Sequence, residues 1–166
     1  QSLMIWEINT AADITSIATH VLKGEIHRVS GASNLAVDEF TKAMEIEDQL
    51  NYNEPPDWFF SVRHLLGEVL LEMKNYTEAE KVYREDLSYW VKNGFALNGL
   101  YHSLVGQGKT EEAEKVKEQL TKAWQYADSE LKFSRIDDAK RTNLAIRIDE
   151  STPNNLVYIA GNFCKN

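Results

Sequence analysis

The chain has 166 residues, of which 43% are hydrophobic and 27% charged, and its formal net charge is −8. This composition is typical of a soluble globular protein with about one domain and an appendage. The negative charge argues against a nucleic-acid partner, because binding a phosphate backbone needs a basic face. No run of about eighteen apolar residues occurs, so we expect no membrane-spanning helix.

The single cysteine and the two ends of the chain add little about its location. Cys164 alone can form neither an intrachain disulfide nor a cysteine-based zinc site. The start at Gln1 has no basic segment, so we expect no signal peptide and a chain that continues upstream. The apolar residues 3–6 predict that this end is covered by upstream repeats or by self-association. The cytoplasm is slightly favoured.

Two helices are predicted in the first part of the chain. From Ala11 onward, apolar residues recur every three or four positions until a break at residues 30–33. Thr10 or Asp13 is expected to cap this helix. A second helix with an apolar face follows over residues 35–46.

A proline-containing loop separates these helices from the next pair. Pro55 and Pro56 cannot lie inside a helix but suit the turn before one. The next apolar face spans residues 58–70, and Asn75 with Glu78 reads as a capping box for a fourth helix.

A third pair of helices follows the Asn93–Gly94 turn. Its first helix carries apolar residues from 95 to 104 and stops near residues 106–108. Its second helix begins near Thr110 and continues to Trp124.

A short motif recurs in the fourth and sixth predicted helices. The sequence Glu-Ala-Glu-Lys-Val occurs at residues 78–82 and again at 112–116, with the two alanines 34 residues apart. A fixed period of this size is typical of stacked helical repeats. The three helix-turn-helix pairs resemble tetratricopeptide repeats.

Residues at the tight packing positions of that family support the resemblance. Gly67 and Tyr83 match its helix-A glycine and helix-B aromatic, and Gly24 and Phe40 match them in the first pair. Residues 10–136 also resemble the C-terminal part of long bacterial tetratricopeptide-repeat proteins without an assigned activity, through the Glu-Pro-Pro-Asp-Trp motif at residues 54–58 and Ser134-Arg135 near the end. The resemblance implies an all-α, right-handed stack over residues 11–136, with pairs at about 11–50, 57–92 and 93–127.

The tail, residues 137–166, has a different pattern. Residues 143–148 alternate as a β-strand and residues 155–159 are β-branched and aromatic, so a hairpin is predicted. Residues 157–163 are similar to the second strand of starch-binding-type β-sandwich modules. The tail is therefore either a hairpin or the start of a second domain. If the tail belongs to a sugar-binding module, a location outside the cytoplasm is favoured.

Candidate binding residues lie on the first helix of each pair, because these helices line the concave face of such a stack. The polar side chains that the family register places there include the candidate binding residues Arg28, His64, Glu68, Asn98 and His102. Glu25 and Glu68 on this face would repel an acidic peptide, which argues against a carboxylate clamp.

Trp58 is a further candidate, because a long loop with a tryptophan can close over a groove. The competing interpretation is that Trp58 and Phe59 fill the gap between two helix pairs. Arg63 could pair with Glu54, Asp57 or Asp86.

The favoured function is a non-enzymatic scaffold that binds a peptide or protein segment on its concave face, without a catalytic residue, metal or cofactor. One alternative is a carbohydrate-associated protein with a C-terminal sugar-binding module. Another is a metal or enzyme site at His64, Glu68 and His102, because imidazole and carboxylate ligands suit transition metals.

Overall fold

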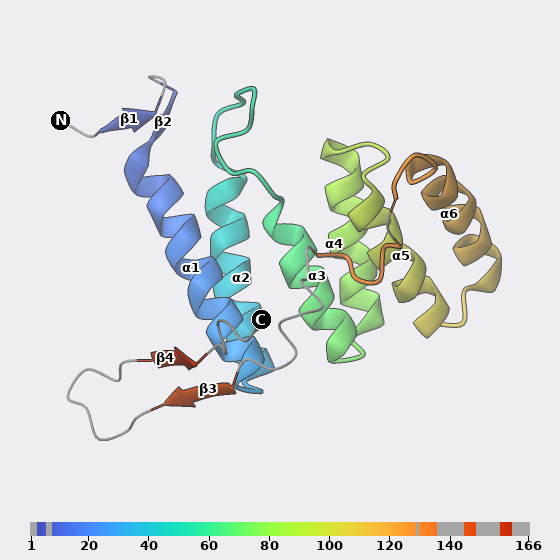
Figure 1. Ribbon diagram of the computed structural model, residues 1–166. Coiled ribbons are helices and arrows are strands. Elements are labelled where there is room, and N and C mark those ends of the chain that lie inside the picture. Colours follow the sequence, from blue (N-terminus) through green and yellow to red (C-terminus); the bar gives the residue numbers. More distant parts are fainter. Residues whose placement is uncertain (1–2, 6–7, 129, 136–144, 149–156, 161–166) are drawn as a thin grey trace, which may run out of the picture. The chain divides into compact units, whose positions relative to one another are not determined.

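A computed structural model describes residues 3–5, 8–128, 130–135, 145–148 and 157–160. The chain divides into two compact units, Gln1–Arg135 and Ile136–Asn166. The first unit is built from helices, which confirms the predicted all-α fold (Figure 1). Within the described residues, no helix is both long enough and apolar enough to cross a membrane.

The described part of the first unit contains six helices, each near a predicted position. They are α1 (Ala11–Val29), α2 (Ser33–Glu47), α3 (Val62–Glu72), α4 (Tyr76–Tyr89), α5 (Gly94–Gly106) and α6 (Thr110–Ala123). Two short strands that the sequence pattern did not predict precede them. These strands, β1 (Met4–Ile5) and β2 (Asn9–Thr10), form an antiparallel pair.

The helix starts follow the capping rules in part. The Thr10 hydroxyl oxygen accepts the Asp13 amide at 3.1 Å, as predicted, and the Asn93 side chain accepts two amides of α5. The predicted capping box at Asn75 is wrong, because the Asn75 side chain makes no capping hydrogen bond.

Helix α3 starts at Val62, four residues later than the apolar pattern from Trp58 suggested. Residues 57–60 form bends instead, and the Val62 amide donates to the Glu47 carboxylate at 2.9 Å. A side chain from α2 therefore satisfies one of the free amides at the start of α3.

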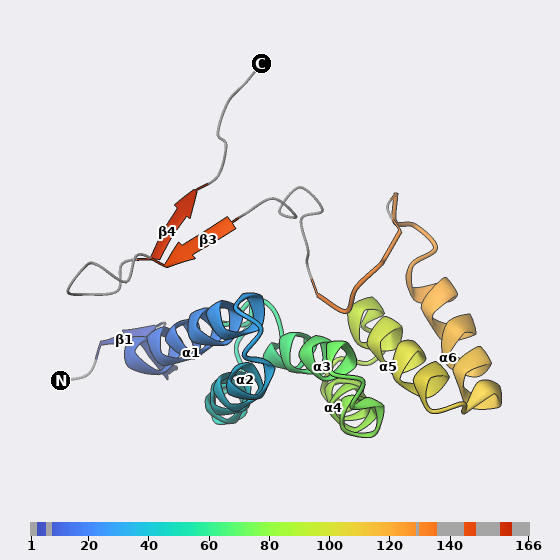
Figure 2. The same ribbon diagram turned by 90° about the horizontal axis from the view of Figure 1, so that it is seen from below.

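Successive helices pack on one another as antiparallel neighbours, and α3 also contacts α5. In Figure 2, α1 and α3 lie on one side of the first unit and α2 and α4 on the other. Residues 130–135, drawn in orange after α6, run along α5 and α3 on the side away from α4. We call these six residues the closing segment, and the surface of α1, α3 and α5 beneath it the inner face.

Two aromatic rings set the distance between neighbouring helices. A Cβ atom on Gly24 would overlap the ring of Phe40, and one on Gly67 would overlap the ring of Tyr83. The sequence predicted close helix packing at these glycines, and the two contacts confirm it. Tyr83 also contacts Gly99. One buried ring of α4 therefore sets the distance from α4 to both α3 and α5.

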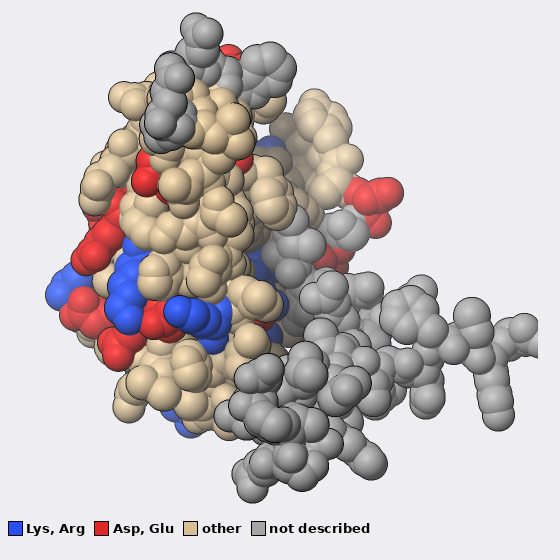
Figure 3. All heavy atoms as spheres, turned by 90° about the vertical axis from the view of Figure 1, so that its left-hand side faces the viewer, with Lys and Arg blue, Asp and Glu red and all other residues tan. Residues whose placement is uncertain are grey.

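The α1 end of the first unit carries a broad area without charged side chains (Figure 3). Leu22 on α1 and Leu35 on α2 are both exposed. That another repeat or a second copy covers this end stays a prediction.

The second unit contains two described strands, β3 (Ala145–Ile148) and β4 (Val157–Ala160), which pair antiparallel. The predicted hairpin strands are confirmed over these residues. The predicted connection between them lies outside the described residues, and membership of a sugar-binding sandwich stays a prediction.

Replacing Gly67 with alanine tests the packing of Tyr83. We expect Gly67→Ala to lower the free energy of unfolding by about 1–3 kcal/mol, because the added methyl group must displace a buried ring. Urea unfolding measures this change. Alanine is the better helix former by about 1 kcal/mol, so an unchanged or stabilised variant would contradict the packing.

Candidate functional site

The inner face is not open along its whole length. The five candidate binding residues were predicted to lie on a solvated concave face, but His64, Glu68 and Asn98 are only 1%, 7% and 3% exposed. Arg28 is half-buried and His102 is exposed. The expectation of a solvated patch is therefore wrong for the three buried residues, because the closing segment and neighbouring side chains cover them.

Ser134 anchors the closing segment on α3. Its backbone amide donates to Glu68 Oε2 at 2.8 Å, and its hydroxyl lies 2.6 Å from the same oxygen. Tyr83 reaches the Ser134 hydroxyl from α4. Burial raises the pKa of the Tyr83 phenol well above its usual range, so Tyr83 stays protonated and can donate to Ser134.

Arg135 anchors the same segment on α1. Its guanidinium contacts Glu25 at 2.7 Å, and Glu25 also contacts Arg28 at 3.3 Å. Arg28 in turn reaches Glu72 on α3 at 2.9 Å. Arg28 is thus engaged by two carboxylates of its own chain, and a line of alternating charges crosses the inner face from the closing segment to α3.

His64 belongs to the buried interior rather than to a surface site. Its Nε2 lies 3.0 Å from Asp86 on α4, and both side chains are almost fully buried. Its ring packs edge-on against Phe60, with the centroids 4.6 Å apart. The sequence offered Asp86 only as a possible partner of Arg63, whereas its partner in the structure is His64.

The structure gives the metal alternative no support. The described residues contain no group of three or more His, Cys, Asp or Glu side chains placed to hold a metal ion. His64 faces Asp86, whereas Glu68 is used by Ser134. His102 stacks edge-on beside Tyr101, with the ring centroids 5.1 Å apart.

Part of the inner face does remain open beside the closing segment. A cavity of about 400 Å³ lies there, which we call the inner-face cavity. Its lining includes Glu68, Glu72 and His102 from the helices and Lys132 and Phe133 from the closing segment. Two of the predicted groove residues, Glu68 and His102, therefore share one cavity.

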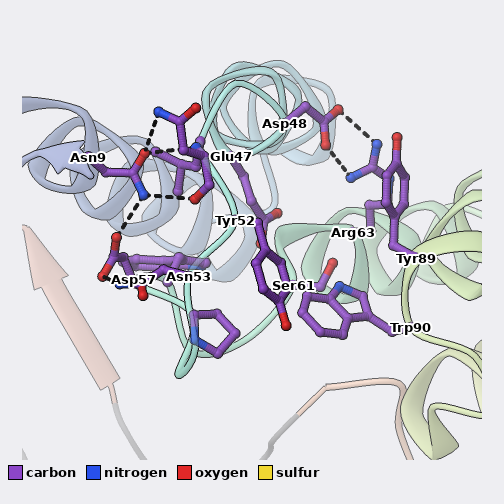
Figure 4. Close-up of a pocket in the computed structure, with 14 residues that line it drawn as sticks. Asn9, Glu47, Asp48, Tyr52, Asn53, Asp57, Ser61, Arg63, Tyr89 and Trp90 are labelled. Atoms are coloured by element: carbon purple, nitrogen blue, oxygen red, sulfur yellow. Dashed lines mark hydrogen bonds and ion pairs between the residues drawn. The ribbon is translucent and has the colours of Figure 1, made fainter. Parts of the chain in front are cut away.

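A second cavity, of about 290 Å³, lies where the loop after α2 meets the end of α4 (Figure 4). We call it the loop cavity. Its lining residues come from β2, the end of α2, the loop, the start of α3 and the end of α4: Asn9, Glu47, Asp48, Leu50, Asn51, Tyr52, Asn53, Pro56, Asp57, Trp58, Ser61, Arg63, Tyr89 and Trp90. Trp58 packs against the core, as the competing interpretation expected, and it lines the loop cavity rather than the inner-face cavity.

Arg63 forms one wall of the loop cavity, with different partners from those predicted. Its two terminal nitrogens lie 2.6 and 2.8 Å from the two carboxylate oxygens of Asp48, and Glu85 is 3.2 Å away. Its guanidinium also sits 5.3 Å from the centre of the Tyr89 ring. This arrangement joins α2, α3 and α4 around the cavity (Figure 4).

Asn9 holds the loop in place and was missed by sequence reasoning. This buried side chain donates to the Asn51 carbonyl at 3.0 Å and to Asp57 at 2.7 Å, and it accepts the Asn51 amide at 2.8 Å. Asp57 also accepts from Asn53 at 3.0 Å. An isolated asparagine 42 residues from its partner gives no periodic signal, so only the folded chain shows this contact.

Glu47 is a lining carboxyl group whose pKa is strongly raised. Burial raises its pKa from 4.5 to about 7, against the opposing effect of the Val62 amide and the nearby Arg63. A carboxyl group in this range changes its charge near neutral pH, so the loop cavity becomes more negative as the pH rises through 7.

No protein-family model matches the chain, and no curated protein matches it.

Glu47 should make the stability of the fold depend on pH. Between about pH 4.5 and pH 7 the folded state binds a proton that the unfolded state releases, so this group's contribution to stability falls as the pH rises. We expect Glu47→Gln to raise the free energy of unfolding at pH 8 by about 1–3 kcal/mol, with little gain at pH 4. Urea unfolding across this pH range is the measurement.

The exposed Glu45 on the same helix provides the matched control, because Glu45→Gln should leave the pH profile unchanged. Parallel pH profiles for wild type and Glu47→Gln would contradict a buried Glu47 with a raised pKa.

Proposed function

We propose that the chain is a tetratricopeptide-type repeat protein that acts as a non-enzymatic scaffold and binds a protein segment on its inner face. The 34-residue spacing of the recurring motif supports the family assignment. The contacts of Gly24 with Phe40 and of Gly67 with Tyr83 support it as well, because close helix packing at these positions is what the resemblance implies.

The observation that carries the proposal is the way the chain binds its own closing segment. This segment has no regular secondary structure, and the inner face holds it through a backbone amide and two side chains, Ser134 and Arg135. A surface that holds a segment of its own chain in this way has the groups needed to hold a similar segment of another protein.

The charges of the inner face indicate the chemistry of such a partner. Glu25, Glu68 and Glu72 contribute carboxylates from α1 and α3, and Arg28 lies between two of them. A hydroxyl residue followed by arginine, as in Ser134-Arg135, satisfies Glu68 and Glu25 together. The proposed partner is therefore a basic segment.

The positions of the acid–base residues favour binding over catalysis. His64 and Asp86 form the buried histidine–carboxylate pair, and both are sealed from solvent. A substrate could not reach them without unfolding the contact between α3 and α4.

A peptide competition tests the proposal. In the full-length chain, Ser134→Asp brings a carboxylate against Glu68 and should release the closing segment. A labelled peptide with the sequence of residues 130–135 should then bind this variant at least about tenfold more tightly than wild type, because the inner face is free in a larger fraction of molecules. Fluorescence anisotropy measures the affinity, and circular dichroism verifies that the variant is folded.

The matched control peptide carries aspartate in place of the serine and should not bind. The milder variant Arg135→Glu should release the closing segment from Glu25. It should likewise bind the serine peptide but not the aspartate peptide. Equal affinity for the two peptides, or no binding to either opened variant, would contradict the proposal.

A further inference from the structure

We propose that the loop cavity is a second binding site, independent of the inner face, and that it takes one neutral sugar ring. The cavity volume of about 290 Å³ is at the lower end of the range for small-molecule sites. The loop, the end of α2 and the end of α4 all contribute to it, so it does not overlap the surface under the closing segment.

The charges around the loop cavity exclude an anionic ligand. Glu47, Asp48 and Asp57 bring three carboxyl groups to its lining, whereas Arg63 is the single basic side chain in that lining. Arg63 is already held by Asp48 and Glu85. An anion would therefore meet carboxylates without a free cation to offset them.

The same wall argues against a cationic ligand. Aromatic rings near carboxylates can form a cage for an ammonium group. Here, however, the Arg63 guanidinium already lies against the Tyr89 ring at 5.3 Å. A second cation would have to displace Arg63 from the Tyr89 ring, and Asp48 and Glu85 hold Arg63 in that position.

Aromatic side chains of the lining are unusually exposed. Tyr52, Tyr89 and Trp90 are 76%, 63% and 44% exposed, although all three line one cavity (Figure 4). Exposed aromatic groups gathered around one cavity are typical of a binding site rather than of a solvated surface. The C–H faces of a sugar ring are apolar and stack on such rings.

Polar groups of the lining complement the hydroxyls of a sugar. Each hydroxyl both donates and accepts, so it needs a mixture of acceptors and donors. Asp57 and Glu47 supply acceptors, and Asn51, Asn53 and Ser61 supply groups of both kinds. Asn9 fixes the positions of Asn51 and Asp57, so part of this arrangement exists before a ligand arrives.

Titration of the full-length chain with methyl glycosides of glucose, galactose, mannose and N-acetylglucosamine tests the inference. At least one should bind saturably with a Kd of about 1–10 mM, as expected for one small ring. Saturation-transfer NMR and tryptophan fluorescence report binding, the latter because Trp58 and Trp90 line the cavity.

Matched tyrosine variants connect binding to the loop cavity. Tyr52→Ala should weaken the affinity about five- to tenfold through loss of one stacking ring. Tyr126 is 92% exposed and lies outside the lining, so Tyr126→Ala should leave the affinity unchanged. Both tyrosines are exposed, so neither change should alter folding.

Several outcomes would overturn the inference. These are the failure of every methyl glycoside to bind, sugar binding that survives Tyr52→Ala, and binding of tetramethylammonium or an N-acetylproline amide in place of the sugars. None of these results bears on the inner-face peptide assay, which reports a different surface.

Discussion

The buried ring of Tyr83 is the constraint that the other parts of the first unit depend on. The ring meets Gly67 on α3 and Gly99 on α5, positions where a Cβ atom would overlap it. Its hydroxyl contacts Ser134, the anchor of the closing segment. One side chain thus sets the spacing of three helices and also supports the segment that lies across them, so fold and inner face are linked.

The buried Glu68 carboxylate shows how the closing segment is held. A carboxylate without partners would be costly in this position, but Ser134 supplies its amide and its hydroxyl to the same oxygen. Partner binding on the inner face must therefore replace these bonds as well as displace the segment. A partner can bind only those molecules in which the segment is released. Because this fraction is small, the apparent affinity for the partner is lower than the intrinsic affinity of the uncovered inner face.

The local features of the fold could be predicted from the sequence, whereas the long-range contacts could not. Apolar spacing and the Thr10 cap located the helices, and the glycine–aromatic pairs located their close contacts. Ser134 lies 66 positions from Glu68 and Asn9 lies 48 from Asp57, so no periodic pattern connects either pair. Sequence reasoning identified the right helices for the inner face but could not show what covers them.

Amide hydrogen exchange at Ser134 tests the central claim most directly, namely that the chain occupies its own inner face. In the full-length protein, the Ser134 amide should exchange much more slowly than an exposed amide, because it is buried and bonded to Glu68. Glu68→Gln should raise its exchange rate in a protein that remains folded, because the amide loses a charged acceptor. Exchange of the wild-type Ser134 amide at the rate of an unstructured peptide would contradict the account.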